Sequence, residues 1–296
     1  MDRPLRIGFV MEQVLGHVTW YQNLRRAVDA VGATAGVEAR WVETKMWECD
    51  GRLERLPGVP SFVKASGRAL LDTQRGLRGW PYDVLLFNTQ KAAALCQWQM
   101  LRTPTLLMTD VTPAQYDRMA ALYDHPVDAN PAVRALKHQA NVVNFRLAAA
   151  LLPSSTWARD SFVDEYGVPA ERVHVIPIGT DTAYWHPVVE RQPSARAQLL
   201  FVGGHLERKG GRLLLDVFRD LRLYERADLH LVTRDTLEPP AGVFVHRMEN
   251  NSPELLRLYQ RADAFVLPTL ADCFGNASIE AMAVGLPVIT TAMGGI

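Results

Sequence analysis

Several features that would point to secretion, membrane insertion or nucleic-acid binding are missing from this 296-residue chain. It holds three cysteines, Cys49, Cys96 and Cys273, and their spacing suits neither a metal site nor a redox site, which predicts reduced thiols in the cytoplasm. The formal net charge is zero at pH 7, which gives no electrostatic support to a nucleic-acid partner. No apolar run is long enough to span a membrane, and the first residues do not form a signal peptide.

Common metal and nucleotide motifs are missing too. The eight histidines are scattered and never form the His-Glu-x-x-His zinc motif. No glycine-rich segment is followed by the Gly-Lys-Ser/Thr of a P-loop. We therefore expect neither a bound metal nor an organic cofactor.

The pattern that is present is an alternation of strand-length apolar segments with helices of 3.6-residue periodicity. This order predicts an α/β fold with mostly parallel sheets and crossover helices. The length suits two domains of ordinary size, each with its own core. A Pro- and Gln-containing stretch at residues 190–196 is the expected linker. We therefore expect one domain over residues 1–190 and a second over residues 191–296.

The most informative segment carries two acids eight positions apart, Asp272 and Glu280. An apolar strand over residues 264–268 precedes them, a Phe-Gly pair follows the first acid, and Asn276 is the expected cap of a helix. This order places Asp272 beyond the carboxyl end of a strand, where open α/β sheets bind ligands. The free amides near Asn276 can hold an anion, and Glu280 can reach a polar group of the same ligand.

A second motif lies upstream, where a buried strand ends in a glycine turn with two cations before a helix. The turn begins with Gly203 and Gly204, and the cations are Arg208 and Lys209. Glycines let the main chain approach a ligand closely, and an Arg-Lys pair can neutralise a diphosphate. An isolated Arg-Lys pair is commonly a solvated turn, but the acidic motif on the same predicted sheet favours phosphate binding.

Both helices that follow these motifs have a predicted apolar face. In the helix after the second motif, Leu213, Leu214, Val217 and Leu221 recur at helical spacing. In the helix of the acidic motif, Ile279, Met282 and Ala283 share one face and are expected to pack on the sheet. Gly285 is the expected end of that helix.

The two motifs together resemble the signature of retaining glycosyltransferases of family 4, which have the GT-B fold. The family has Glu, seven residues and Glu, with Phe-Gly after the first acid, and a glycine turn that leads to Lys-Gly. Here Asp272 replaces the first Glu, which shortens the side chain by one methylene. Gly204 stands where the family usually has Arg, so Arg208 beside Lys209 is the expected substitute. The chain also lacks the Asp-x-Asp motif that glycosyltransferases of the other major fold use to hold a metal.

The resemblance implies two Rossmann-like domains that face each other across a cleft, with the nucleotide-sugar site in the second. It implies transfer of a sugar from a nucleotide-diphosphate donor to an acceptor hydroxyl, with retention and without a metal, in glycan or glycolipid synthesis. The acceptor would be a glycan, a lipid-linked molecule or a small molecule. Asp272, a candidate catalytic residue, would meet the donor sugar, and Glu280 the ribose. The other expected donor-binding residues are Gly16, Gly204, Arg208, Lys209, Phe274, Gly275 and Asn276.

The first half of the chain gives three further candidates. Gly16 falls near the start of a predicted helix, where family members bring a glycine loop close to the donor phosphates, but it is equally a plain turn. His17 either faces the acceptor or caps the loop, and the sequence favours the cap. Asp110 follows a predicted strand in a region where many family members carry a His. It is a candidate catalytic residue, or the start of an Asx-turn before Thr-Pro.

Several alternatives remain open at this stage. Family members continue past Gly294 and Gly295 to a last strand and returning helices, so the sequence is either a fragment or lacks these elements. In both cases we expect a truncated second domain that binds donor weakly and turns over slowly. A non-catalytic nucleotide-sugar-binding remnant and a nucleotide-sugar epimerase of the same fold are the rival functions. A basic amphipathic helix over residues 132–152 could lie on the inner, anionic face of a membrane, but the sequence favours an ordinary packing helix with a solvated face.

Overall fold

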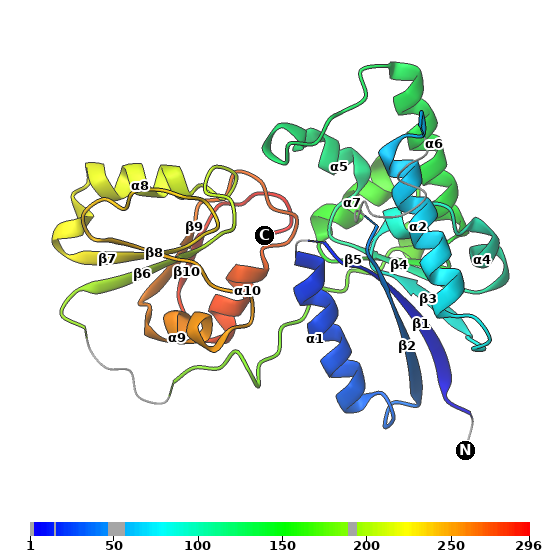
Figure 1. Cartoon of the computed structure of the whole chain (residues 1–296), viewed down its shortest axis with the longest axis horizontal. Helices are drawn as coiled ribbons and strands as arrows, with labels where there is room; N and C mark the ends of the chain where they lie inside the picture. Colours follow the sequence, from blue (N-terminus) through cyan, green and yellow to red (C-terminus); the bar gives the residue numbers. More distant parts are fainter. Residues whose placement is uncertain (1–2, 15, 47–56, 189–193) are drawn as a thin grey trace. The chain divides into compact units, whose positions relative to one another are not determined.

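A computed structural model describes residues 3–14, 16–46, 57–188 and 194–296 as two compact units (Figure 1). Unit 1 comprises Met1–Tyr116 and Val127–Gly179, and unit 2 comprises Asp117–Pro126 and Thr180–Ile296. Unit 2 is therefore discontinuous in sequence. The boundary expected between residues 190 and 191 lies outside the described residues.

Unit 1 is built on a five-stranded sheet of order β2-β1-β3-β4-β5, in which every pairing between these strands is parallel. Helices connect the strands, as the alternating pattern predicted. The elements that begin in this unit are β1 (Leu5–Glu12), α1 (Gly16–Val31), β2 (Val37–Thr44), α2 (Ser61–Gly76), β3 (Val84–Phe87), α3 (Gln90–Ala93), α4 (Gln97–Arg102), β4 (Thr105–Thr109), α5 (Pro113–Arg118), α6 (Pro131–Leu147), β5 (Ala150–Pro153), α7 (Thr156–Asp164) and the 3-10 turn η2 (Ala170–Arg172).

The core of unit 1 forms between the sheet and these helices. Leu85, Phe87 and Leu151 on the strands are fully buried, as are Phe145 of α6 and Phe162 of α7. The predicted helix over residues 132–152 ends earlier than expected, at Leu147, because the next apolar residues form β5. Among the described helices, none combines the length and the apolar character that crossing a membrane requires.

Unit 2 is built on a second five-stranded parallel sheet, of order β10-β9-β6-β7-β8. Both sheets confirm the predicted α/β class with parallel strands. The elements of this unit are η1 (Ala120–Leu122), β6 (Ala197–Val202), α8 (Gly211–Asp220), η3 (Leu223–Glu225), β7 (Ala227–Val232), β8 (Val243–His246), α9 (Pro253–Arg261), β9 (Ala264–Leu267), α10 (Asn276–Ala283) and β10 (Val288–Thr290).

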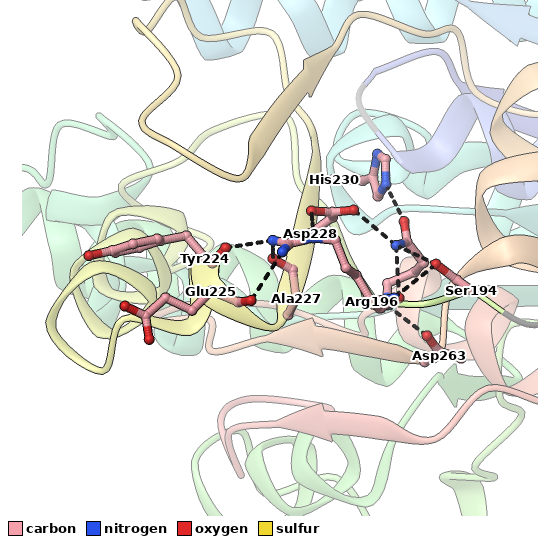
Figure 2. Close-up of polar contacts among 9 residues, drawn as sticks. Ser194, Arg196, Tyr224, Glu225, Ala227, Asp228, His230 and Asp263 are labelled. Atoms are coloured by element: carbon pink, nitrogen blue, oxygen red, sulfur yellow. Dashed lines mark hydrogen bonds and ion pairs between the residues drawn. The ribbon is translucent and has the colours of Figure 1, made fainter.

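Arg196, which directly precedes β6, anchors the start of this strand to β7 and to the residues just before β7 (Figure 2). Its guanidinium pairs with Asp228 of β7 at 2.7 Å and donates to the carbonyl oxygens of Tyr224 and Ala227 at 2.5 and 2.7 Å. Gln198, next on the same face, donates through Nε2 to Asp228 at 3.1 Å and accepts through Oε1 from Nε2 of His230 at 2.9 Å. These bonds link the amino ends of β6 and β7. The loops that carry the two predicted motifs lie at the opposite, carboxyl edge of this sheet.

The helix faces of unit 2 differ from the prediction. In α10 the buried residues are Ser278, Glu280 and Ala281. Of the predicted face, Ala283 packs against the core but Met282 is 53% exposed. In α8 the buried side chains are Leu214 and Phe218, and the other three predicted core positions, Leu213, Val217 and Leu221, are 50%, 40% and 63% exposed. The buried face of each helix is set by packing against neighbouring elements, and the spacing of apolar residues within the helix does not specify it.

Candidate active site

The loops after β6 and β9 meet at the carboxyl edge of the second sheet. The carbonyl oxygen of Arg208 accepts hydrogen bonds from Leu270 N at 2.9 Å and from Thr269 Oγ1 at 3.2 Å. Gly210 has φ of 72°, and a Cβ there would lie 1.8 Å from the carbonyl oxygen of Pro268. Glycine is therefore required at this position, because both the left-handed conformation and the close approach exclude a side chain. The two predicted motifs form one site.

Lys209 and Asp272 form a mostly buried ion pair at this junction, with side chains 15% and 10% exposed. Burial lowers the pKa of Lys209, and Asp272 opposes that effect. The loop after β10 also reaches this point, since a Cβ on Gly294 would lie 1.8 Å from the Asp272 carbonyl oxygen. The acid and the cation that the sequence assigned to separate tasks are thus each other's partner in the unliganded chain.

Tyr123, a residue in neither predicted motif, holds Arg208 in place. Tyr123 belongs to the segment Asp117–Pro126 of unit 2, and its ring centroid lies 4.3 Å from the guanidinium carbon of Arg208. Nη1 of Arg208 donates to the Tyr123 hydroxyl and to the Ala271 carbonyl oxygen, both at 3.2 Å. The same hydroxyl lies 3.4 Å from Sγ of Cys273, and burial raises its pKa. Tyr123 therefore fixes the direction of the guanidinium.

The amino end of α10 lies directly after this junction. Gly275, with φ of 82°, precedes the helix as its N-cap, so the prediction that Asn276 is the cap is wrong: Asn276 is the first helical residue. Phe274 is buried. Ser278 Oγ is also buried, and it has no hydrogen-bond partner among the described residues. Gly285 ends the helix with φ of 79°, as predicted. Gly204 lies in the turn after β6, where a Cβ would find ordinary contacts at 3.8 Å.

Glu280 lies one turn into α10, on its buried side. The carboxyl is 9% exposed and accepts a hydrogen bond of 3.1 Å from the hydroxyl of Tyr259, which is itself fully buried. Burial raises the pKa of Glu280 from 4.5 to about 7, against the opposing effect of the Tyr259 hydrogen bond. At neutral pH the unliganded carboxyl is therefore close to half protonated, and a charged or polar ligand would shift this balance.

A third polar group occupies the carboxyl edge of the first sheet in unit 1. Glu12 ends β1, Asp110 follows β4, and His17 lies in the first turn of α1, which begins at Gly16. Oε2 of Glu12 lies 3.4 Å from Nδ1 of His17, and Oδ1 of Asp110 lies 3.8 Å from Nε2. The structure thus brings the predicted residues His17 and Asp110 together.

Glu12, which is not among the predicted site residues, completes this group. Its carboxylate is almost fully buried, and Asn88 after β3 holds its main chain through bonds of 2.7 and 3.3 Å. Burial by itself would lower the pKa of His17, but hydrogen bonds and attraction from Asp110 and Glu12 raise it to about 9. The imidazole is therefore a cation between two acids at neutral pH. Its strand-end position beside a glycine loop was the one signal that could have identified Glu12.

The described residues contain no group of three or more His, Cys, Asp or Glu side chains arranged to hold a metal ion. The cations Arg208 and Lys209 are instead the charged groups beside the glycine turn of unit 2. Independence from metal remains a prediction.

Comparison with known proteins agrees with this geometry. Residues 12–179 match the family described as glycosyl transferase 4-like domain, and residues 196–296 match glycosyl transferases group 1. The chain belongs to this glycosyltransferase family, and its two parallel-sheet units are the Rossmann-like halves of the GT-B fold.

Curated relatives and solved structures show the same relationship. A D-inositol 3-phosphate glycosyltransferase of Paenarthrobacter aurescens is 28% identical over 171 residues, which is 50% of this chain and 42% of the relative. A glycogen synthase of Mycobacterium tuberculosis is 29% identical over 184 residues, 55% of this chain and 42% of that protein. The chain therefore spans about two fifths of the length of these relatives.

The solved structures resemble the chain over nearly its whole length. Sucrose-phosphate synthase from Thermosynechococcus elongatus has a TM-score of 0.69 at 17% identity, covering 98% of this chain and 82% of that one. WaaG, a glycosyltransferase involved in lipopolysaccharide biosynthesis, has a TM-score of 0.63 at 16% identity with the same coverage. At these identities the likeness shows the fold.

Proposed function

We propose that the chain transfers a sugar from a nucleotide-diphosphate donor to an acceptor hydroxyl, with retention and without a metal, in glycan or glycolipid synthesis. The acceptor is a glycan, a lipid-linked molecule or a small molecule, and the reaction takes place in the cytoplasm. The observation that carries the proposal is the junction in unit 2, where Arg208 and Lys209 lie beside Asp272 at the carboxyl edge of a parallel sheet. The names of the relatives support the reaction class.

The chemistry needs a site that stabilises a leaving diphosphate. Negative charge grows on the diphosphate as the bond between sugar and oxygen breaks, and donors fixed beforehand in a partly buried site stabilise it most. Arg208 meets this requirement because Tyr123 and the Ala271 carbonyl already orient it. Gly275 and Asn276 at the start of α10 add main-chain amides, and Phe274 and Gly204 shape the same site.

The acids of unit 2 take different parts in this proposal. A donor phosphate attracts Lys209 and frees Asp272, the proposed catalytic residue, to accept from a hydroxyl of the donor sugar. Glu280 accepts from the ribose. Gly16, in unit 1, is proposed as a further donor-binding residue. In unit 1, His17 and Asp110 bind the acceptor hydroxyl, and Glu12 holds His17 in its charged form.

Turnover assays test the proposal. The chain is incubated with UDP-, GDP- and ADP-sugars and a panel of sugar and lipid-linked acceptors, with and without EDTA, and the product's anomeric configuration is read by NMR. Retained configuration and indifference to EDTA are expected. Binding of nucleotide without turnover by a folded, monodisperse chain would instead favour the non-catalytic remnant, and epimerised donor would favour the epimerase.

Replacing Arg208 with alanine should weaken binding of UDP or GDP by about 1.5–3 kcal/mol, the range for hydrogen bonds to charged groups. Titration calorimetry measures the effect. Arg212→Ala is the matched control, because it removes the same charge four residues on, from an exposed pair with Glu207. Equal affinities of the two variants would contradict the assignment of Arg208 to the diphosphate.

Removing the hydroxyl of Tyr123 should weaken nucleotide binding by about 1 kcal/mol, since Tyr123→Phe keeps the ring under Arg208 but removes the hydrogen bond between the two side chains. Tyr123→Ala should cost more, because the stacking is lost as well. Tyr184→Phe is the control: it removes a 2.8 Å hydrogen bond to the Asn251 carbonyl in the same unit. If Tyr184→Phe lowers affinity as much as Tyr123→Phe, the effect is one of general stability.

A further inference from the structure

One face of α6 is both apolar and exposed. Val133, Leu136, Ala140 and Val143 recur at intervals of three and four residues, and we call them the α6 outer face. Their side chains are solvent-accessible: Leu136 is 71% exposed and Val143 is 50% exposed. The residues that pack α6 on unit 1, Val142 and Phe145, lie on the opposite side of the helix. The expected packing side and solvated side are both present, but the solvated side carries exposed apolar residues in addition to Arg134 and Arg146.

A second exposed apolar group adjoins the first. Trp98 and Leu101 of the short helix α4 are 63% and 67% exposed. α4 is fastened to α6 by Gln97, whose Nε2 donates to Asn144 Oδ1 at 2.8 Å. A tryptophan exposed to this degree, beside exposed leucines, is unusual on a surface that contacts only water.

All charged residues of α6 and α4 themselves are cations. α6 carries Arg134, Lys137 and Arg146 and not a single Asp or Glu among its 17 residues. Arg102, at the end of α4, lies with its guanidinium carbon 3.8 Å from the centre of the Trp98 ring. Lys137 pairs with Asp128 outside the helix at 2.5 Å. Long cationic side chains beside apolar ones can place their stems in an apolar layer and their charges among anionic groups.

α8 provides a comparison within the same chain. Its exposed apolar residues Leu213 and Val217, together with Leu221 at its C-cap, also repeat at helical spacing. Its charges are balanced, because Arg219 pairs with Asp216 at 3.1 Å and with Asp220 at 2.9 Å. An apolar stripe alone is thus present twice, but the combination with unbalanced positive charge is a property of the α6 surface.

We propose that unit 1 binds the surface of an anionic lipid bilayer through the α6 outer face together with Trp98 and Leu101. The apolar side chains enter the boundary between headgroups and acyl chains, and Arg102, Arg134 and Arg146 contact the anionic headgroups. Tryptophan suits this boundary because its ring is apolar and its N–H is polar. This interaction is independent of the proposed sugar transfer, since it needs neither donor nor acceptor.

Vesicle co-sedimentation of the whole chain tests the proposal without any turnover. Vesicles of phosphatidylcholine with phosphatidylglycerol should bind the chain, vesicles of phosphatidylcholine alone should bind it at least tenfold more weakly, and added salt should weaken the anionic case. Leu101→Glu/Leu136→Glu should lower the partition coefficient at least tenfold, because both side chains are exposed and their loss costs no internal packing. Arg102→Gln and Arg146→Gln should each lower it about fivefold.

Leu213→Glu/Leu221→Glu on α8 is the matched control, and it should bind as the unaltered chain does. Circular dichroism verifies that each variant is folded at the temperature of the assay. Absence of binding to anionic vesicles, equal binding to neutral vesicles, or equal loss in the α6 and α8 variants would each overturn the proposal.

Discussion

Lys209→Ala should lower the free energy of unfolding of unit 2 by about 3 kcal/mol, because it leaves the carboxylate of Asp272 mostly buried without its partner. Removing one member of a buried pair costs more than removing both, since the remaining charge keeps its desolvation penalty. The effect should be visible as faster hydrogen exchange and an earlier denaturant transition in peptides from β6 and β9.

The double variant Lys209→Met/Asp272→Leu distinguishes this cause from a general loss of packing. With both charges replaced by apolar groups, most of the lost stability should return, although nucleotide-sugar binding should not. Arg219→Ala is the control for charge removal at an exposed pair, where a change of at most about 1 kcal/mol is expected. A double variant no more stable than Lys209→Ala would refute the buried-pair explanation.

Glu280→Gln should stabilise unit 2 by about 3 kcal/mol above pH 8 and have little effect near pH 4.5. The pKa of this carboxyl rises from 4.5 in the unfolded chain to about 7 in the folded one, so the folded state binds more protons between these values. Stability therefore falls as pH rises from 4.5 through 7, and each pKa unit corresponds to about 1.4 kcal/mol. Glutamine removes the titration while it keeps an acceptor for Tyr259.

The measurement is the difference in unfolding free energy between Glu280→Gln and the unaltered chain at each pH. A difference is needed because His17 in unit 1 acts in the same direction: its pKa of about 9 gives stability that is lost as pH rises from 6.5 through 9. If the difference does not change between pH 4.5 and 8, the carboxyl is not held in an unfavourable environment. In the proposed function the same variant should bind nucleoside diphosphate more weakly, since the charged hydrogen bond to ribose is lost.

The sequence predicts the α/β class and the position of the two motifs because both depend on local patterns. Strand-length apolar runs, the glycine at position 210 and the Phe-Gly after Asp272 each specify a local conformation. Their meeting at one sheet edge follows from the rule that parallel strands end on the same side. The structure shows in addition how the two loops are joined, because the carbonyl oxygen of Arg208 accepts hydrogen bonds from Thr269 and Leu270.

What the sequence does not predict depends on contacts between distant residues. The exposed positions of Met282 and Leu213 follow from how α10 and α8 are rotated against their neighbours, which the 3.6-residue period leaves open. The N-cap is Gly275 because the main chain is left-handed at this residue, whereas side-chain capping preferences led to the prediction of Asn276. Tyr123 stacks on Arg208 across 85 positions, and no local pattern connects the two.

The discontinuity of unit 2 has a consequence for the order in which the chain can fold during synthesis. The segment Asp117–Pro126 leaves the ribosome 82 residues before Arg208 (208 − 126), which at the usual rates of translation is an interval of roughly 4–16 seconds. The stacking of Tyr123 on Arg208 can therefore form only after that interval. Unit 2 is therefore not a module that a single cut in the gene could transplant, since residues 180–296 alone would lack the ring on which Arg208 rests.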